Sequence, residues 1–250
     1  MSMLKIIISP AKKMKEDTDG LSIRDLPEFL SQTEVLLSRL QSMSYSELKA
    51  LWKCNDQIAS QNFERIKHMD LYHGLTPAVL AYDGIQYQYM APNVFTNSEF
   101  EYIQDHLRIL SGFYGVLRPF DGVSPYRLEM QAKLNVENAV NLYEFWGDKI
   151  AESVLHNTKF VINLASKEYS QCISRYLPCD IQFITCVFGE LKQGKVIEKG
   201  TMCKMARGEM VRFMAENQVT EPQEIKAFQR LNYSFSDAHS DEHTYVFLKT

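Results

Sequence analysis

Arginine, glycine and aromatic residues are concentrated in one stretch of the chain, between Leu107 and Met130. Arginine carries a planar, permanently charged group that fits phosphate and carboxylate oxygens. Glycine allows positive φ angles and lets the backbone approach another group closely. The combination predicts an anion-binding element, with a polynucleotide phosphate backbone as the expected ligand. Its arginines are Arg108, Arg118 and Arg127.

The centre of this stretch predicts a tight turn bounded by Gly112 and Gly115. We predict that a helix runs through Leu110 into this turn, which gives the outline of a helix–hairpin–helix. Glycine amides in that motif bind DNA phosphates without reading bases. The turn is one residue longer than usual, and Pro119 shortens the second helix. The alternative is a helix that ends at a glycine and continues as an ordinary loop.

Two further candidates follow predicted buried strands. Lys12 ends the segment Ser9–Lys12, and Asn163 begins the segment Asn163–Tyr169. Open α/β sheets bind ligands beyond the carboxyl ends of their strands. Lys12 is therefore a candidate anion ligand and Asn163 a candidate hydrogen-bonding residue. A solvated basic loop and a helix cap are the structural alternatives.

A predicted helix near the end of the chain carries another basic group. Lys204, Arg207 and Gly208 are spaced i, i+3 and i+4, so they share one helix face. The glycine lets a backbone or a ligand come close to the two cations. This spacing is typical of a cationic pocket, and a solvated basic face explains it equally well.

Metal and redox signals are weak. Six residues separate Cys172 from Cys179 and Cys179 from Cys186, whereas zinc and iron–sulfur sites favour a separation of about two residues. The sequence contains no phosphate-binding loop, no dinucleotide fingerprint and no Ser–His–Asp signature. We predict no metal site and no cofactor, and Asp121 and Glu129 remain candidate acids without an assigned reaction.

Composition limits the classes of protein that the chain can represent. It has 250 residues, a formal net charge of −4 and a pI near 5.9, which argues against a uniformly basic DNA-coating surface but not against a local basic patch. No apolar run approaches the roughly 20 residues that span a bilayer, and the apolar run near the first residue is shorter than that of a signal peptide. We expect a cytoplasmic protein that does not enter membranes.

Hydrophobic periodicity predicts one α/β or mixed α+β domain over residues 1–250, with a mixed sheet flanked by helices. Capping boxes are predicted at Ser44 and Glu47, at Thr96 and Glu99, and at Thr220 and Gln223. The predicted strands cover 4–8, 79–82, 127–134, 159–164, 180–191, 195–198, 233–235 and 244–248. The predicted helices cover 22–42, the segment after Ser44, 55–68, the segment from Thr96 to Leu110, 141–155, 167–176 and 201–217.

Five motifs, in this order, resemble those of the YaaA family, bacterial proteins tied to peroxide stress. They are Ile8–Lys12, His106–Met130, Leu142–Ile150, Asn163–Tyr169 and Lys204–Met214. The resemblance covers nearly the whole chain. It implies a single α/β domain with a cationic cleft and a helix–hairpin–helix, in a cytosolic protein that binds DNA, including double-stranded DNA, and limits peroxide damage driven by free intracellular iron.

The resemblance also assigns residues to two places. Gly112, Gly115, Arg118, Tyr126 and Arg127 would belong to the hairpin region. The cleft would be lined by Lys12, Lys204 and Arg207.

Three functions remain open at this stage. The first is a DNA-binding protein whose phosphate contacts give affinity with little base preference. The second is an enzyme acting on a small anionic or nucleotide-like substrate, held by the cationic segments together with Asn163 and Tyr169, with Glu129 or Tyr126 transferring protons. The third is direct iron sequestration, against which the absence of a compact His, Cys and carboxylate motif argues. The most informative structural observation is whether Lys12, Arg127, Lys204 and Arg207 converge in space. A deep pocket that gathers the side chains of the second function would favour that function, and their scattering over separate faces would exclude it.

Overall fold

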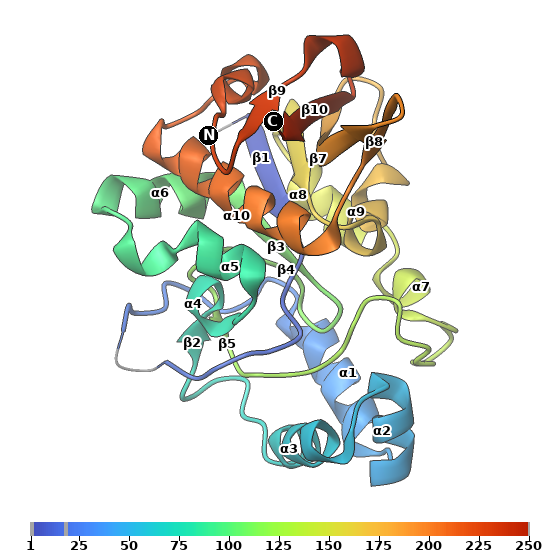
Figure 1. Cartoon of the computed structure of the whole chain (residues 1–250). Coiled ribbons are helices and arrows are strands. Elements are labelled where there is room, and N and C mark those ends of the chain that lie inside the picture. Colours follow the sequence, from blue (N-terminus) through green and yellow to red (C-terminus); the bar gives the residue numbers. More distant parts are fainter. Residues whose placement is uncertain (1–2, 18–19, 250) are drawn as a thin grey trace.

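A mixed eight-stranded sheet runs through the protein, whose computed structural model describes residues 3–17 and 20–249 (Figure 1). Its order is β4-β3-β1-β6-β7-β10-β9, with β8 paired to β7. The strands β3, β1, β6, β7 and β10 are parallel, and β4, β8 and β9 are antiparallel to their neighbours. Strand bounds are β1 Leu4–Ile8, β3 Leu107–Ser111, β4 Gly115–Leu117, β6 Phe160–Leu164, β7 Gln182–Lys192, β8 Lys195–Ile197, β9 Tyr233–Phe235 and β10 Thr244–Lys249; β2 Thr76–Pro77 and β5 Gly122–Val123 form a separate pair.

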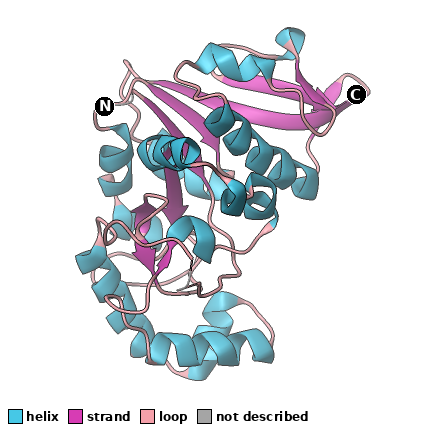
Figure 2. Cartoon of the chain, turned by 90° about the vertical axis from the view of Figure 1, so that its left-hand side faces the viewer, coloured by secondary structure: helices cyan, strands magenta, loops and turns pink. Residues whose placement is uncertain are grey.

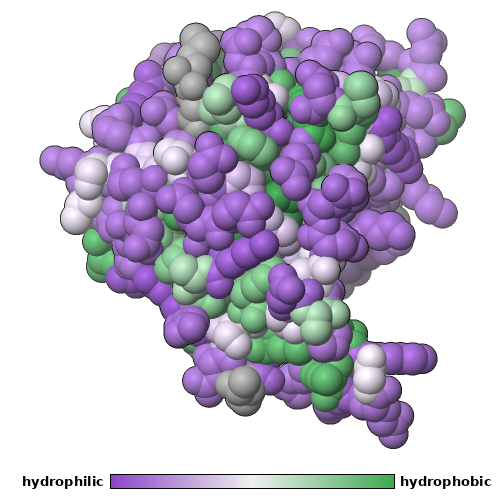
Figure 3. Space-filling view, turned by 90° about the horizontal axis from the view of Figure 1, so that it is seen from above, coloured by the Kyte–Doolittle hydropathy of each residue, from purple (hydrophilic) through white to green (hydrophobic). Residues whose placement is uncertain are grey.

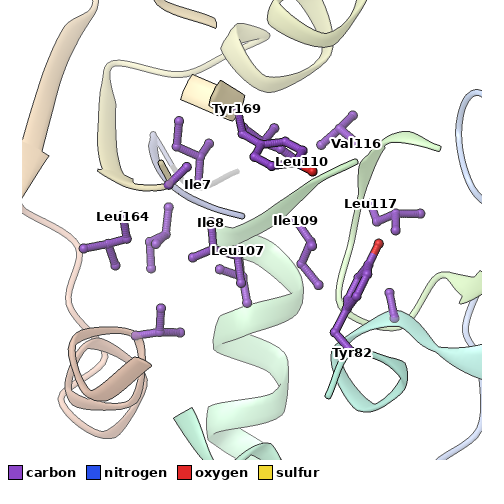
Figure 4. Close-up of a cluster of buried hydrophobic side chains, with 14 of the residues drawn as sticks. Ile7, Ile8, Tyr82, Leu107, Ile109, Leu110, Val116, Leu117, Leu164 and Tyr169 are labelled. Carbon is purple, nitrogen blue, oxygen red and sulfur yellow. The ribbon is translucent and has the colours of Figure 1, made fainter. Parts of the chain in front are cut away.

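Strand β1 lies at the centre of the sheet because its side chains are apolar on both faces. Ile6, Ile7 and Ile8 are fully buried, and each such side chain contributes roughly 1.5–3 kcal/mol when it leaves water. Ile8 lies opposite Ile109 on one side and Leu164 on the other. Figure 4 shows these strand residues packed together with the rings of Tyr82 and Tyr169. The predicted central strands at 4–8 and 159–164 are confirmed.

Helices cover both faces of the sheet. In Figure 1, α10 crosses in front of it, α8 and α9 lie behind it, and α1 to α3 form a helical group below it; Figure 2 shows the same group extending away from the sheet. Helix bounds are α1 Leu30–Gln41, α2 Tyr45–Trp52, α3 Asp56–Lys67, α4 Ala78–Ala81, α5 Ile85–Met90, α6 Asn97–His106, α7 Leu142–Trp146, α8 Lys149–Leu155, α9 Lys167–Ser174 and α10 Gly200–Glu216; the short 3₁₀ helices are η1 Pro92–Val94, η2 Pro222–Ala227 and η3 Asp237–His239. The fold is thus a single compact α/β domain with a mixed sheet, as predicted.

Two of the three predicted capping boxes are confirmed. The Ser44 and Thr96 side chains each accept a hydrogen bond from the backbone three residues on, and Glu47 and Glu99 return the bond. The third box is displaced by one residue, because Glu221 and Glu224 form it around η2. Predictions at 55–68, 201–217 and the hairpin of β7 and β8 are also confirmed.

The helix predicted to run through Leu110 is wrong beyond His106. Leu107–Ser111 is strand β3, which pairs with β1 and β4. The segment is apolar enough for either structure, and sheet pairing decided its conformation because the buried backbone groups find partners there. Strands, not helices, therefore flank the turn before Gly115, and the helix–hairpin–helix-like element is not confirmed.

Four other boundaries were predicted incorrectly. Helix α1 begins at Leu30 rather than at 22, because the backbone around Arg24 and Asp25 bonds to the segment at Phe120 and Gly122. Residues 79–82 form most of the short helix α4 instead of a strand. Residues 127–134 are not a strand. The helix predicted over 141–155 is split at Gly147, whose φ of 53° lies in the left-handed region.

The surface of the molecule is dominated by polar side chains. Figure 3 shows a mainly hydrophilic face interrupted by smaller hydrophobic areas. In the part of the chain that the structure describes, no helix combines the length and apolar character needed to cross a membrane.

Candidate functional site

A cleft opens beyond the carboxyl ends of β1 and β6, two neighbouring parallel strands. From β1 the chain continues to β3 on one side, and later returns to β6 on the other side. This reversal of direction is the position at which open α/β sheets bind ligands. The cleft has a volume of about 520 Å³. Its lining comes from 9–13, 83–87, 126–129, 166–169 and α10.

Ser9 ties the two strand ends together. The Ser166 backbone N–H donates to Ser9 Oγ at 2.8 Å, and Ser9 Oγ donates to Ser166 Oγ at 3.2 Å. The Tyr87 hydroxyl donates to the Ser9 carbonyl oxygen at 3.0 Å, which attaches helix α5 to the same point. These bonds fix the floor of the cleft without using charged groups.

Four predicted cations converge on the cleft from three separate segments: Lys12, Arg127, Lys204 and Arg207 all line it. Lys12 Nζ lies 2.9 Å from Glu129 Oε1, and Arg127 Nη2 lies 3.3 Å from the same oxygen. Five cationic side chains, including Lys13, line the cleft against three carboxylates. The local charge is therefore positive although the chain as a whole is acidic.

Buried hydrogen-bond donors without partners are concentrated here. Four such side-chain nitrogens occur among the described residues, and three belong to residues of the cleft: Gln86 Nε2, Arg127 Nε and Arg207 Nε. A buried polar group without a partner costs roughly 1–3 kcal/mol. A ligand with acceptor oxygens or nitrogens would supply the missing partners.

The carboxylates of the cleft differ in environment. Burial, and then the nearby negative charge of Glu129, raise the pKa of Glu168 above its usual range. The Gln131 backbone N–H donates to Glu168 Oε1 at 3.2 Å, which opposes that rise. Asp83 pairs with Lys13 at 2.5 Å, and the bond holds the pKa of Asp83 below its usual range. Glu168 therefore takes up a proton more readily than an ordinary glutamate.

Tyr126 lines the cleft, but its hydroxyl is bonded to the protein interior. It lies 2.6 Å from Ser111 Oγ and 2.9 Å from the Tyr82 hydroxyl. Burial raises the pKa of Tyr126 to about 12. The ring thus forms a wall of the cleft, while the hydroxyl holds that wall to β3.

Arg108 and Arg118 do not lie in this cleft. They line a separate hollow of about 390 Å³ together with Asp25 and Asp121. Arg118 Nε donates to Asp121 Oδ1 at 3.0 Å, and Arg118 Nη2 lies 3.0 Å from Asp25 Oδ2. Arg108 donates to backbone carbonyl oxygens of Gln104 and Leu107. Both guanidinium groups are engaged in holding the fold together.

Gly112 and Gly115 lie in a buried turn between β3 and β4. A Cβ atom at Gly112 would lie 2.6 Å from the Leu128 carbonyl oxygen, because the segment 128–130 crosses directly over it. The amides of Phe113 and Tyr114 donate to Ser111 Oγ. These glycines therefore provide close packing, and the turn amides are already bonded within the protein.

Asn163 lies beneath the cleft and does not line it. Its Nδ2 donates to Thr185 Oγ1 at 3.2 Å, and its Oδ1 accepts from the Ala165 backbone N–H at 3.0 Å. Asn163 thereby shapes the chain where β6 turns toward α9. Its contribution is structural support for Ser166.

Helix α5 is the part of the cleft that the sequence did not predict. It supplies Gln86 and Tyr87, and the loop before it supplies Asp83 and Gly84. Gly84 faces the Ala11 side chain, so the two cleft loops pack closely. The sequence signal that could have identified this helix is Gly84 followed by the tyrosine-containing segment 85–90. The segment contains no charged residues, so a pattern of anion-binding residues does not include it.

Another cavity of similar volume, about 520 Å³, lies between α1 and α7 and is lined by Ser31, Glu137, Phe145 and Lys149 among others. It contains none of the predicted binding residues.

Among residues 3–17 and 20–249, no three His, Cys, Asp or Glu side chains gather in a metal-binding group. The cleft at β1 and β6 is thus the candidate site supported by both sequence and geometry.

Comparison with known proteins gives matches along the whole chain. A family profile described as peroxide stress protein YaaA matches residues 4–239. A UPF0246 protein of Agathobacter rectalis is 58% identical over 244 residues, which cover 98% of each chain. A UPF0246 protein of Lachnoclostridium phytofermentans is 56% identical over 246 residues, covering 98% of this chain and 96% of the relative. A UPF0246 protein of Pediococcus pentosaceus is 52% identical, with 98% of each chain covered.

Proposed function

The chain belongs to the peroxide stress protein YaaA family, also named UPF0246, and we propose that it protects DNA by binding it through the cleft at β1 and β6. The ligand is the phosphate backbone of DNA, double-stranded DNA included, with little base preference. The protection from peroxide damage driven by free intracellular iron, which the family resemblance implies, is then a consequence of occupying DNA. The cytoplasm is the compartment that this role requires.

The observation that carries the proposal is the convergence of cations around one cleft. Lys12, Arg127 and the pair Lys204 and Arg207 come from three distant segments and line the same hollow. Arg127 and Arg207 keep buried Nε donors without partners. Arginine donors without acceptors are suited to phosphate oxygens, which accept hydrogen bonds and carry negative charge.

The overall charge of the chain determines what kind of DNA binding is expected. With a net charge of −4, the protein as a whole does not attract DNA, so the affinity comes from a local cationic surface. A small number of phosphate contacts then supplies the affinity. Each contact contributes roughly −0.9 to the slope of a plot of log affinity against log salt concentration. Binding is expected to be weak at physiological salt and to strengthen sharply at low salt.

The test compares two surfaces of the same helix. Lys204→Ala combined with Arg207→Ala removes two cleft cations, whereas Arg212→Ala removes a cation that pairs with Glu216 at 2.8 Å and does not line the cleft. Duplex affinity is measured between about 50 and 200 mM salt. The double variant is expected to bind more weakly with a slope flatter by up to about 2, and Arg212→Ala to resemble the wild type. Equal slopes in all three proteins would overturn the proposal.

A second candidate is an enzyme on a small anionic or nucleotide-like substrate. The observation that favours it is the placement of Glu168, whose pKa is raised, beside the cations of the cleft. A carboxyl group whose pKa is raised by burial holds a proton more readily than an ordinary carboxylate, which suits it to proton transfer. NMR of nucleotides incubated with the wild type and with Glu168→Gln tests it: turnover by the wild type and none by the variant would support an enzyme, and no turnover by either would argue against an enzyme on these substrates.

A further inference from the structure

The cleft has an aromatic and apolar lining in addition to its cations. Three tyrosines, Tyr87, Tyr126 and Tyr169, form its walls and are 4%, 4% and 6% exposed. Leu128 adds an aliphatic surface to the same walls. The volume of about 520 Å³ lies within the range of roughly 300–1,000 Å³ typical of small-molecule sites. Phosphate binding alone does not require this aromatic lining.

Gln86 adds a specific polar group to this lining. Its side chain is buried, with 7% of the residue exposed, and Nε2 has no partner among the described residues. A glutamine amide offers both a donor and an acceptor. The phosphodiester groups of DNA only accept hydrogen bonds, whereas the edge of a nucleobase presents donors and acceptors side by side. An acceptor atom on the edge of a base would bond to the unpartnered Nε2, and a glutamine amide can also accept from a donor on the same edge.

The amide and the cations occupy adjacent positions. Helix α10 packs on α5 so closely that a Cβ atom at Gly208 would lie 2.1 Å from the Gln86 carbonyl oxygen. Arg207, the preceding residue, lines the cleft together with Gln86, and both carry a buried donor without a partner. One ligand that joins a phosphate to a hydrogen-bonding ring would satisfy both.

We infer that the cleft holds one unstacked nucleotide, with its phosphate at Arg127, Lys204 and Arg207 and its base in the tyrosine-walled space against the Gln86 amide. The inference rests on the proposed function, because it assigns a ligand class to the same cleft. A base within a duplex keeps its Watson–Crick edge paired, so the nucleotide comes from a mismatch, a strand end or single-stranded DNA, or binds as a free monophosphate. The base adds contacts that inorganic phosphate lacks.

Calorimetric titration with the four 2′-deoxynucleoside 5′-monophosphates and with inorganic phosphate tests the inference. The monophosphates are expected to bind at least about tenfold more tightly than inorganic phosphate, and Gln86→Leu to reduce this ratio about tenfold. Gln88→Leu is the matched control, since Gln88 is an exposed neighbour on α5 that bonds to Asp83 and does not line the cleft. Equal affinity for phosphate and monophosphates, or an equal ratio in the Gln86 and Gln88 variants, would overturn the inference.

A second variant, Gln86→Glu, distinguishes loss of the amide donor from loss of the fold. Gln86→Glu keeps the volume of the side chain but removes the donor, so it is expected to reduce the same ratio while thermal unfolding remains close to that of the wild type. The base contact is supported if both Gln86 variants show a reduced ratio of monophosphate affinity to inorganic phosphate affinity, and at least one of them unfolds at the same temperature as the wild type. An unchanged ratio in the folded Gln86→Glu protein refutes it.

DNA containing 2-aminopurine separates this inference from the proposed function. Binding is expected to raise the fluorescence of 2-aminopurine placed at a mismatch more than that of the same base in a matched duplex. Duplex binding without any monophosphate binding would overturn the nucleotide pocket and leave the proposed function standing. Monophosphate binding without any DNA binding would overturn the proposed function and support a pocket for free nucleotides.

Discussion

Gly208 contacts Gln86 through the closest backbone approach found at any glycine of the described chain: a Cβ atom at position 208 would lie 2.1 Å from the Gln86 carbonyl oxygen. The contact joins α10, which carries Lys204 and Arg207, to α5, which carries the buried amide. The two helices cannot come this close with any larger residue at the crossing. The relative position of the cationic and amide groups of the cleft therefore depends on this one glycine.

Gly208→Ala is expected to push α5 and α10 apart, lowering the free energy of unfolding by about 1–3 kcal/mol and weakening DNA binding. Gly200→Ala on the same helix is the control, because a Cβ atom there meets open space. Urea unfolding and duplex affinity are measured for both. Equal unfolding free energies and equal duplex affinities for the two variants would show that α5 and α10 accommodate the added methyl group without loss of stability or binding.

Glu129→Gln is expected to strengthen DNA binding. Its carboxylate pairs with Lys12 and Arg127, and removing the charge frees both cations for phosphate. The expected result is higher affinity and a salt slope steeper by up to about 1–2, since each additional phosphate contact contributes roughly −0.9. Glu190→Gln, which breaks a surface pair with Lys199 away from the cleft, is expected to leave the slope unchanged. An unchanged slope in Glu129→Gln would mean that the two cations do not contact phosphate.

The affinity for DNA is expected to rise as the pH falls from neutral toward 5. The pKa of Glu168 lies above its ordinary value of 4.5, so this group takes up a proton before ordinary glutamates do and the cleft becomes more positive. Glu168→Gln is expected to bind more tightly at neutral pH and to lose most of this dependence. Affinity measured at constant ionic strength over pH 5–8 would contradict the prediction if both proteins gave parallel curves.

Tyr126→Phe is expected to lower stability without changing the salt slope of DNA binding. The lost hydroxyl bonds Ser111 and Tyr82 in the interior. Ser111 Oγ keeps the amides of Phe113 and Tyr114, but the buried Tyr82 hydroxyl loses the bond to Tyr126, which costs about 1–3 kcal/mol. Tyr176→Phe, at a tyrosine with 43% exposure, is the control for the substitution itself. A flatter salt slope in Tyr126→Phe would instead indicate that its hydroxyl contacts phosphate.

Arg118→Ala distinguishes the second hollow from the cleft. Removing this side chain leaves Asp121, which is 1% exposed, without its guanidinium partner, so a stability loss of about 1–3 kcal/mol is expected. The salt slope of DNA binding is expected to stay at the wild-type value, because Arg118 lies outside the cleft. A reduced slope would place DNA contacts on that hollow as well.

Burial raises the pKa of Asp121 to about 6, even though Arg118 and Arg108 lower it. Because this pKa is higher in the folded protein than in the unfolded chain, Asp121 stabilises the fold below about pH 4, and this contribution is lost as the pH rises through about 6. The unfolding free energy of the wild type relative to Asp121→Asn should therefore increase as the pH falls from 7 to 4. Urea unfolding across that range checks the direction, and a decrease would contradict it.

The sequence by itself determined the elements whose signals are local. β-Branched runs predicted β1 and β6, paired Ser/Thr and Glu residues predicted two helix starts, and the i, i+3 spacing of Lys204 and Arg207 placed both on one helix face. These features depend on backbone preferences and on hydrophobic periodicity over a few residues, and both are independent of the tertiary structure. The four cations of the cleft were identified by the same local patterns and by family resemblance.

Only the tertiary structure decided which arginines join the cleft that the family resemblance assigned to Lys12, Lys204 and Arg207. Arg127 lines it, and Arg108 and Arg118 do not. Leu107–Ser111 became a strand because β1 and β4 offered backbone partners, and this placed the turn of Gly112 in the interior and directed Arg118 to Asp121. Gln86 joined the cleft only because Gly208 lets α10 approach α5. The pairing of Ile6 with Leu107 joins positions 101 apart, and the contact of Gly208 with Gln86 joins positions 122 apart. No local pattern encodes contacts over such separations.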